Sequence, residues 1–185
     1  MTDSVFNAFL ESAAADAAAL NRGSDVLALL PRSAGSPPPR LYDGILRDVE
    51  HLERVADGTV QVSASLVGFT IEFPPDYCRS TDVRLQYRVA RVHAPLLHPN
   101  CKGGILCLGS DFRPGTRLRG VMQEVYAIVC GRNFAAQDAL DPWAAEYYLA
   151  HLDQVRALRS RPLLRRPIGK RRPDRPAGST VDGIS

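Results

Sequence analysis

Apolar residues recur every three to four positions along several stretches of the chain, the spacing that gives a helix one buried face. This pattern predicts helices over residues 3–21, 24–30, 41–56, 121–129 and 142–158. In the first of these, Val5, Phe6, Phe9 and Leu10 form an apolar stripe. Pro142 stands where the last one begins, a first-turn position that suits proline.

Three other stretches alternate apolar and polar residues, at residues 60–66, 69–73 and 83–89. Alternation with period two is typical of a half-buried strand. Because consecutive strands joined by short turns pair as antiparallel neighbours, we expect a β-meander. The sequence therefore predicts an α+β fold in which an antiparallel meander sheet packs with helices.

Serine, proline and glycine interrupt these patterns at residues 33–39, and proline and arginine dominate from residue 159 onward. Such compositions are typical of linkers and disordered tails. We expect a helical N-terminal extension with a Pro-rich linker over residues 1–39, one folded domain over residues 40–158 and a basic disordered tail over residues 159–185.

The net charge of +3 hides an uneven distribution. The first 155 residues carry 14 basic and 18 acidic groups, whereas the remaining 30 carry nine basic and two acidic ones. The basic tail could be solvated, dock an acidic protein surface or bind nucleic acid nonspecifically. It has no aromatic residues for stacking on bases, so nucleic acid is not the expected partner.

No run approaches the roughly 18 apolar residues of a membrane span, and the N-terminus lacks a basic region followed by an apolar core. We therefore expect a cytoplasmic protein with no membrane partner. Its four cysteines show no pairwise metal spacing, so we expect reduced thiols and neither a metal ion nor a cofactor.

Residues 98–108, which read His-Pro-Asn-Cys-Lys-Gly-Gly-Ile-Leu-Cys-Leu, are the most informative stretch. Pro99 keeps His98 out of helical geometry, and the glycine pair lets a short loop double back. Such a loop could hold the Asn100 amide near the Cys107 sulfur. A thiol nucleophile beside a carboxamide donor is suited to acyl transfer.

This stretch resembles the active-site signature of ubiquitin-conjugating enzymes: His-Pro-Asn, a short loop, Gly, two residues, Cys, Leu. Gly104 stands three residues before Cys107, as in that family, although the loop before the glycine is about one residue shorter than usual. Two more segments match in order: residues 73–77 (Phe-Pro-Pro-Asp-Tyr) resemble its Phe-Pro-x-x-Tyr, and Asp141 and Pro142 resemble its Asp-Pro-Leu. The helix predicted at residues 41–56 resembles the first helix of that fold.

The resemblance implies that Cys107 accepts a ubiquitin-like protein from an adenylating activating enzyme as a thioester and passes it to an amine of a protein substrate. Asn100 would donate to the oxyanion or hold the loop in shape. Asp141 would orient or deprotonate the incoming lysine, or else cap the helix that follows it. His98, Pro99 and Gly104 would shape the loop, and Cys101 would be a packing residue.

The chain also departs from the family. The prolines that normally follow Phe-Pro-x-x-Tyr are replaced by residues 78–81 (Cys-Arg-Ser-Thr), and the usual Trp-x-Pro after the cysteine is Phe-Arg-Pro at residues 112–114. These are the surfaces that bind RING-type ligases, so no such ligase is expected. The pattern resembles the divergent bacterial branch of the family, whose members often serve in antiphage operons.

Two other functions are compatible with the sequence. An inactive scaffold could bind a ubiquitin-like protein without forming a thioester, although it would need none of Cys107, Asn100 and Asp141. A cysteine hydrolase would need a histidine beside Cys107, and His98 is the nearest in sequence.

The apolar stripe of the first helix would pack on the domain or dock a partner such as the activating enzyme, and its flexible linker favours the partner.

Overall fold

The computed structural model describes residues 3–32, 38–134 and 136–165. Most of the predicted linker, at residues 33–37, and the predicted tail from residue 166 onward lie outside the described residues. No helix in the described ranges is long and apolar enough to cross a membrane.

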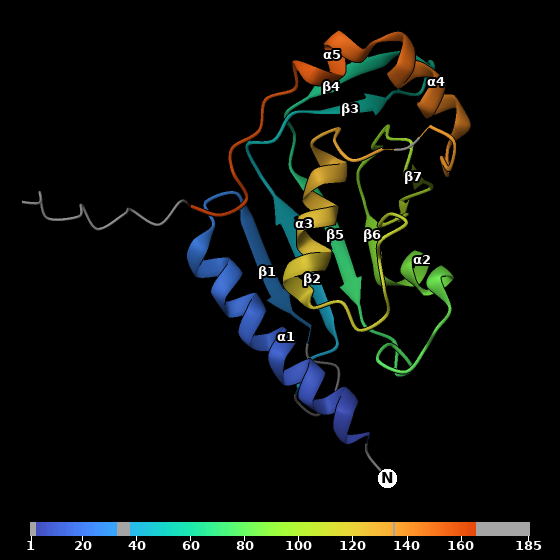
Figure 1. Ribbon diagram of the computed structural model, residues 1–185. Coiled ribbons are helices and arrows are strands. Elements are labelled where there is room, and N and C mark those ends of the chain that lie inside the picture. The colour runs from blue at the N-terminus through green and yellow to red at the C-terminus, as the bar shows by residue number, and fades with distance from the viewer. Residues whose placement is uncertain (1–2, 33–37, 135, 166–185) are drawn as a thin grey trace, which may run out of the picture.

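An antiparallel sheet of six strands forms the centre of the fold (Figure 1), which confirms the predicted α+β class. Its spatial order is β1-β2-β5-β6-β8-β7. The strands are β1 (Leu27–Pro31), β2 (Leu41–Leu46), β5 (Val67–Glu72), β6 (Ala90–Val92), β7 (Cys101–Lys102) and β8 (Ile105–Leu106). A separate hairpin of β3 (His51–Arg54) and β4 (Val60–Ser63) is inserted between β2 and β5.

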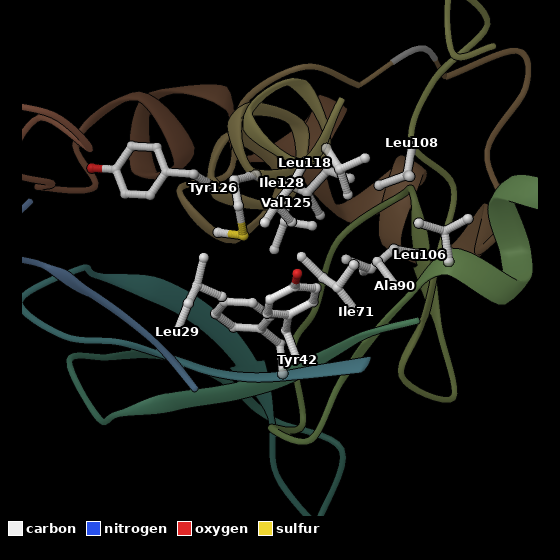
Figure 2. Close-up of a cluster of buried hydrophobic side chains, with 14 of the residues drawn as sticks. Leu29, Tyr42, Ile71, Ala90, Leu106, Leu108, Leu118, Val125, Tyr126 and Ile128 are labelled. Atoms are coloured by element: carbon white, nitrogen blue, oxygen red, sulfur yellow. The ribbon is translucent and has the colours of Figure 1, made fainter. Parts of the chain in front are cut away.

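Two helices, α1 (Ser4–Gly23) and α3 (Leu118–Val129), contribute to the main core together with the sheet. Tyr42 of β2 and Ile71 of β5 are opposite each other in register, and both are fully buried. Figure 2 shows these strand residues facing Val125 and Ile128 of α3. Since alternate residues of a strand point to opposite sides, the even positions of β2 are buried and the odd ones are half-buried or exposed.

A smaller core lies beside the hairpin. Here α4 (Pro142–Ala150) and α5 (Leu152–Arg156) lie next to β3 and β4 (Figure 1). The buried residues of this second core are Leu52, Leu97, Ala144, Tyr148, Val155 and Leu158. The hydroxyl of Tyr148 donates a hydrogen bond to the carbonyl oxygen of Leu97 over 2.9 Å. This bond fixes α4 against the chain segment that leads into the His-Pro-Asn loop.

Several predicted elements are confirmed. The helix predicted at residues 3–21 is α1, the one at residues 121–129 is the greater part of α3, and the strands at residues 60–66 and 69–73 correspond to β4 and β5. The expected meander pairing of these two strands is wrong, because β4 pairs with β3 in the separate hairpin and β5 pairs with β2 and β6. The helix predicted at residues 142–158 begins at Pro142 as expected but is divided into α4 and α5 at His151.

The helices predicted at residues 24–30 and 41–56 are wrong. Residues 41–46 form β2, in which the buried positions are Tyr42, Gly44 and Leu46, a period of two rather than 3.6. In the first segment, the Asn21 side chain donates to the carbonyl oxygen of Leu29 and accepts from its amide, each over 2.8 Å. These bonds hold the β1 main chain extended against the end of α1.

The strand predicted at residues 83–89 is also wrong. This segment forms a 3-10 turn, η1 (Val83–Leu85), followed by the short helix α2 (Gln86–Val89). The Asp82 side chain accepts a hydrogen bond from the Arg84 amide and caps the turn. Leu85 and Val89, four positions apart, are buried, which is the spacing of one helix face.

Helix α1 packs on the described domain, so its expected role as a partner-docking element is not what the structure shows. Its Leu10 and Leu20 are buried in the main core. The ring centroid of Phe9 lies 4.9 Å from that of Phe73 and 5.1 Å from that of Tyr77. Residues 4–31, assigned from the sequence to an extension, thus supply one helix and one strand to the same core.

The start of the predicted tail is also packed. Leu163 is buried in the main core, and the Arg165 amide donates to the carbonyl oxygen of Gly23 over 2.8 Å. Arg161 and Arg165 both form ion pairs with Asp25. The folded part of the chain therefore extends to residue 165, seven residues beyond the boundary expected from the sequence.

Candidate active site

The glycine pair turns the chain back between β7 and β8 and so places Cys107 at the end of β8. Gly103 and Gly104 have φ angles of +56° and +78°, the left-handed region that glycine adopts without strain. A Cβ atom on Gly104 would lie 2.4 Å from the carbonyl oxygen of Val92. The tight turn thus requires glycine at position 104, as the signature implied.

A main-chain hydrogen bond joins the two ends of this loop. The Cys107 amide donates to the carbonyl oxygen of Asn100 over 2.8 Å. Residues that are seven positions apart are therefore direct neighbours. The loop thus brings the two residues together through the main chain, whereas the expected proximity of the Asn100 side-chain amide to the Cys107 sulfur is not established by this bond.

His98 braces the loop from inside. It is fully buried, its Nδ1 accepts from the Asn100 amide over 2.9 Å, and its Nε2 is 3.0 Å from the carbonyl oxygen of Arg132. Burial lowers the pKa of His98 to about 3, so the imidazole is neutral and donates its Nε2 proton to that carbonyl. With both nitrogens engaged, His98 has no free nitrogen to offer Cys107.

Asn100 is 6% exposed, and its side chain braces a second loop. Its Nδ2 donates to the carbonyl oxygen of Asn133 over 3.1 Å. Pro99, also buried, accepts from the Asp141 amide over 2.9 Å through its carbonyl oxygen. The His-Pro-Asn segment is thereby tied to both ends of the chain segment between α3 and α4.

The Cys107 thiol opens into a surface groove of about 450 Å³. The described residues that line this groove are Gln86, Tyr87, Asn100, Cys107, Gly109, Ser110, Gln137, Asp138 and Ala139. Cys107 is half-buried, and its Sγ donates to the Oε1 of Gln86 over 3.6 Å. A partly exposed thiol in a groove is accessible to an acyl donor, whereas a buried cysteine is inert.

The other cysteine of the loop is in a different environment. Cys101 is 4% exposed, and burial raises the pKa of its thiol to about 11. Since the thiolate is the nucleophile, Cys101 is suited to packing and not to acyl transfer.

Asp141 caps α4. Its Oδ1 accepts from the amides of Trp143 and Ala144 over 3.1 and 3.2 Å, which satisfies two of the free N–H groups at the helix start. Among the described residues that line the groove, Asp138 is the one with a carboxylate side chain. The capping role expected as one alternative for Asp141 is thus present in the structure, and a second acid three residues earlier, Asp138, lines the same groove as Cys107.

Three groove residues escaped sequence analysis: Gln86, Tyr87 and Asp138. Burial, reinforced by the nearby Cys107 thiol and Asp138 carboxylate, raises the pKa of Tyr87, so its hydroxyl is protonated. Gln86 and Tyr87 lie in the segment that was expected to be a strand. Because this segment forms α2 instead, both residues line the groove beside Cys107. Asp138 matches no position of the family motif, whose acidic residue corresponds to Asp141.

The Phe-Pro-x-x-Tyr segment packs against the loop that follows Cys107. The buried Tyr77 donates its hydroxyl proton to the carbonyl oxygen of Thr116 over 2.8 Å, and its ring centroid is 6.3 Å from that of Phe112. This segment therefore fixes the chain after the cysteine without lining the groove itself.

In the described part of the chain, no three histidine, cysteine or acidic side chains are grouped closely enough to hold a metal ion. In comparisons with known proteins, no family model and no curated protein matches this chain.

Proposed function

We propose that this protein is a transferase of the ubiquitin-conjugating type. It accepts a ubiquitin-like protein from an adenylating activating enzyme as a thioester on Cys107, and it transfers this modifier to an amine of a protein substrate. One observation carries the proposal: a half-buried thiol opens into a groove while a His-Pro-Asn loop, bonded to the cysteine main chain, is braced behind it.

The arrangement of elements supports a conjugating-type fold. An N-terminal helix precedes four sheet strands that are neighbours in chain order, β1, β2, β5 and β6, and the hairpin that carries the cysteine follows them. In this interpretation, α1 takes the place of the family's first helix, which the sequence pattern suggested at residues 41–56. The resemblance extends the proposal to a cytoplasmic bacterial conjugation pathway of the kind found in antiphage operons.

The chemistry requires two acyl transfers. In the first, the Cys107 thiolate attacks the carbonyl carbon of the activating enzyme's thioester, and the donor sulfur leaves as a thiolate that takes up a proton. In the second, an amine forms the C–N bond, the C–S bond breaks, and Cys107 returns as a thiol. Because a thioester is already activated, neither transfer needs a histidine base beside the sulfur.

Asp138 is the residue placed to assist the second transfer. Its carboxylate lines the same groove as Cys107, where it can orient a lysine ammonium and accept a proton as the amine attacks. Asp141 serves this step indirectly, because its cap and its main-chain bond to Pro99 fix the start of α4.

A scaffold that only binds a ubiquitin-like protein is the alternative, but simple binding does not require a thiol in the groove. A cysteine hydrolase is disfavoured because a histidine is missing from the described residues lining the groove. The nearest one in sequence, His98, is neutral and engaged at both nitrogens.

The test is a loading assay with ATP and an adenylating activating enzyme and ubiquitin-like protein, the candidates for which are sought among the genes neighbouring this one. The wild type and a Cys101→Ala control should form an adduct that reducing agent cleaves. A Cys107→Ala variant should form none, and Cys107→Ser should trap an oxyester that resists reduction. A reducible adduct on Cys107→Ala would refute the assignment of the nucleophile.

Discharge to free lysine then tests the acid. Asp138→Asn should load normally but release the modifier slowly, whereas Asp141→Asn should behave like the wild type because asparagine is an equally good helix cap. The opposite ranking would return the acid's role to Asp141.

A further inference from the structure

The amide side chain that accepts a hydrogen bond from the Cys107 sulfur comes from α2 and not from the His-Pro-Asn loop. Gln86 is 6% exposed, yet its Oε1 lies 3.6 Å from Cys107 Sγ and accepts the thiol proton. A buried polar side chain costs free energy unless it is paired. The partner of the buried Gln86 amide oxygen is the Cys107 thiol, which opens into the groove.

The Asn100 amide, by contrast, is directed to the loop wall. Its Nδ2 is occupied by the carbonyl oxygen of Asn133, and Asn133 is held in turn by a hydrogen bond to Glu124. Asn133 also has a φ of +57°, a left-handed conformation that asparagine adopts more readily than most residues. The Asn100 amide has a second N–H, but reorienting the side chain toward another acceptor would break its bond to Asn133.

We propose that Gln86 is the hydrogen-bond donor to the oxyanion that forms at Cys107, while Asn100 keeps the loop in shape. This inference rests on the proposed transferase function. In the free enzyme, the thiol S–H donates to Gln86 Oε1. Acylation removes that proton, and Oε1 then loses its donor.

Rotating the terminal amide by half a turn exchanges Oε1 for the Nε2 donor. The thioester oxygen is attached through one carbon to the same sulfur, so a group that contacts Sγ is within reach of it. When the amine attacks, the carbonyl π electrons move to this oxygen, and the Gln86 N–H stabilises the charge. As the carbonyl re-forms, the C–S pair leaves with the Cys107 sulfur, and the amine proton passes to Asp138 or water.

The first measurement tests the contact without any modifier. Cys107 alkylation by iodoacetamide is followed by peptide mass spectrometry as a function of pH. Gln86→Glu places a carboxylate against Sγ, and a neighbouring negative charge disfavours the thiolate. The alkylation profile should therefore shift to higher pH, whereas the Gln86→Leu control, which adds no charge, should not shift it upward. An unshifted Gln86→Glu profile would refute the contact.

The second measurement isolates amine attack. Cys107 is acylated with the mercaptoethanesulfonate thioester of an acetyl-Gly-Gly peptide, and its discharge to free lysine is timed. Gln86→Leu keeps the bulk but has no donor, so it should load nearly normally and discharge roughly 10²-fold more slowly. Gln86→Leu discharge at the wild-type rate, with Asn100→Ala slow and still folded, would assign the donor to Asn100.

The two proposals fail differently. If wild-type Cys107 accepts no acyl group from either the peptide thioester or the activating enzyme, the transferase function and the role of Gln86 are both refuted, even with the alkylation shift present. If loading succeeds and Gln86→Leu discharges normally, only the role of Gln86 is refuted.

Discussion

The glycine pair before Cys107 offers a matched test of how the turn positions the thiol. Gly103 and Gly104 both have positive φ angles, so alanine at either position incurs the left-handed penalty of roughly 1–2 kcal/mol. A Cβ atom on Gly103 would meet nothing within 4 Å, whereas one on Gly104 would lie 2.4 Å from the carbonyl oxygen of Val92. The two substitutions therefore differ only in the clash.

The clash cannot be relieved cheaply, because the Val92 amide donates to the carbonyl oxygen of Gly104 over 2.8 Å. Moving β6 away from the turn would stretch this bond and the pairing of β6 with β8. Forcing an extra carbon into a packed site typically costs about 1–3 kcal/mol. Gly104→Ala should thus be less stable than Gly103→Ala by about that amount.

Thermal unfolding measures this difference directly. For a chain of this size, about 1 kcal/mol shifts Tm by roughly 2–4 °C, so Gly104→Ala should melt from about 2 °C to about 12 °C below Gly103→Ala. Equal melting temperatures for the two variants would show that the turn relaxes freely, and the argument that Gly104 fixes Cys107 in place would be refuted.

Three further predictions concern the core, the loop and the thiols. Leu10→Ala, at a position 5% exposed, should lower the free energy of unfolding measured in urea by about 2–5 kcal/mol. Val5→Ala, at a position 57% exposed on the same helix, should change it by less than about 0.5 kcal/mol. Equal small losses in the two variants would show that α1 does not pack in the core. With its pKa lowered to about 3 by burial, His98 takes up a proton in the unfolded chain before the folded one. It should therefore reduce stability by about 1.4 kcal/mol per pH unit as pH falls below about 6.5, and its imidazole ¹⁵N shifts should show an Nε2-protonated neutral ring down to pH 5; titration near 6.5 would contradict this. Iodoacetamide at pH 8 should label Cys107 well before the buried Cys101, and the reverse order would place the reactive thiol elsewhere.

Sequence patterns predicted the long helices well because α1 and α3 each bury one face of a regular 3.6-residue repeat. They failed at residues 41–56, where chance placed apolar residues at helical spacing. There, Leu41 and Ile45 suggested a helix face, but Ile45 is 39% exposed while Tyr42 and Leu46 are buried. Pairing with β1 and β5 on both sides decides this segment, and such long-range pairing is invisible to a local pattern.

The candidate site divides in the same way. Cys107, Asn100 and the loop residues could be found from the sequence because they lie within eleven consecutive positions. Gln86, Tyr87 and Asp138 could not, because they reach the groove from α2 and from the loop before α4. The family motif points to Asp141, but the side chain of Asp141 caps the start of α4.

The contact of Arg165 with Gly23 also has a consequence for how the protein is made. Helix α1 is among the first segments to leave the ribosome, but the Arg165 amide, which donates to the carbonyl oxygen of its last residue, Gly23, is synthesised much later. At about 5–20 residues per second, the C-terminal end of α1 is without this contact for several seconds or more of synthesis. The described fold can therefore be completed only after residue 165 has left the ribosome.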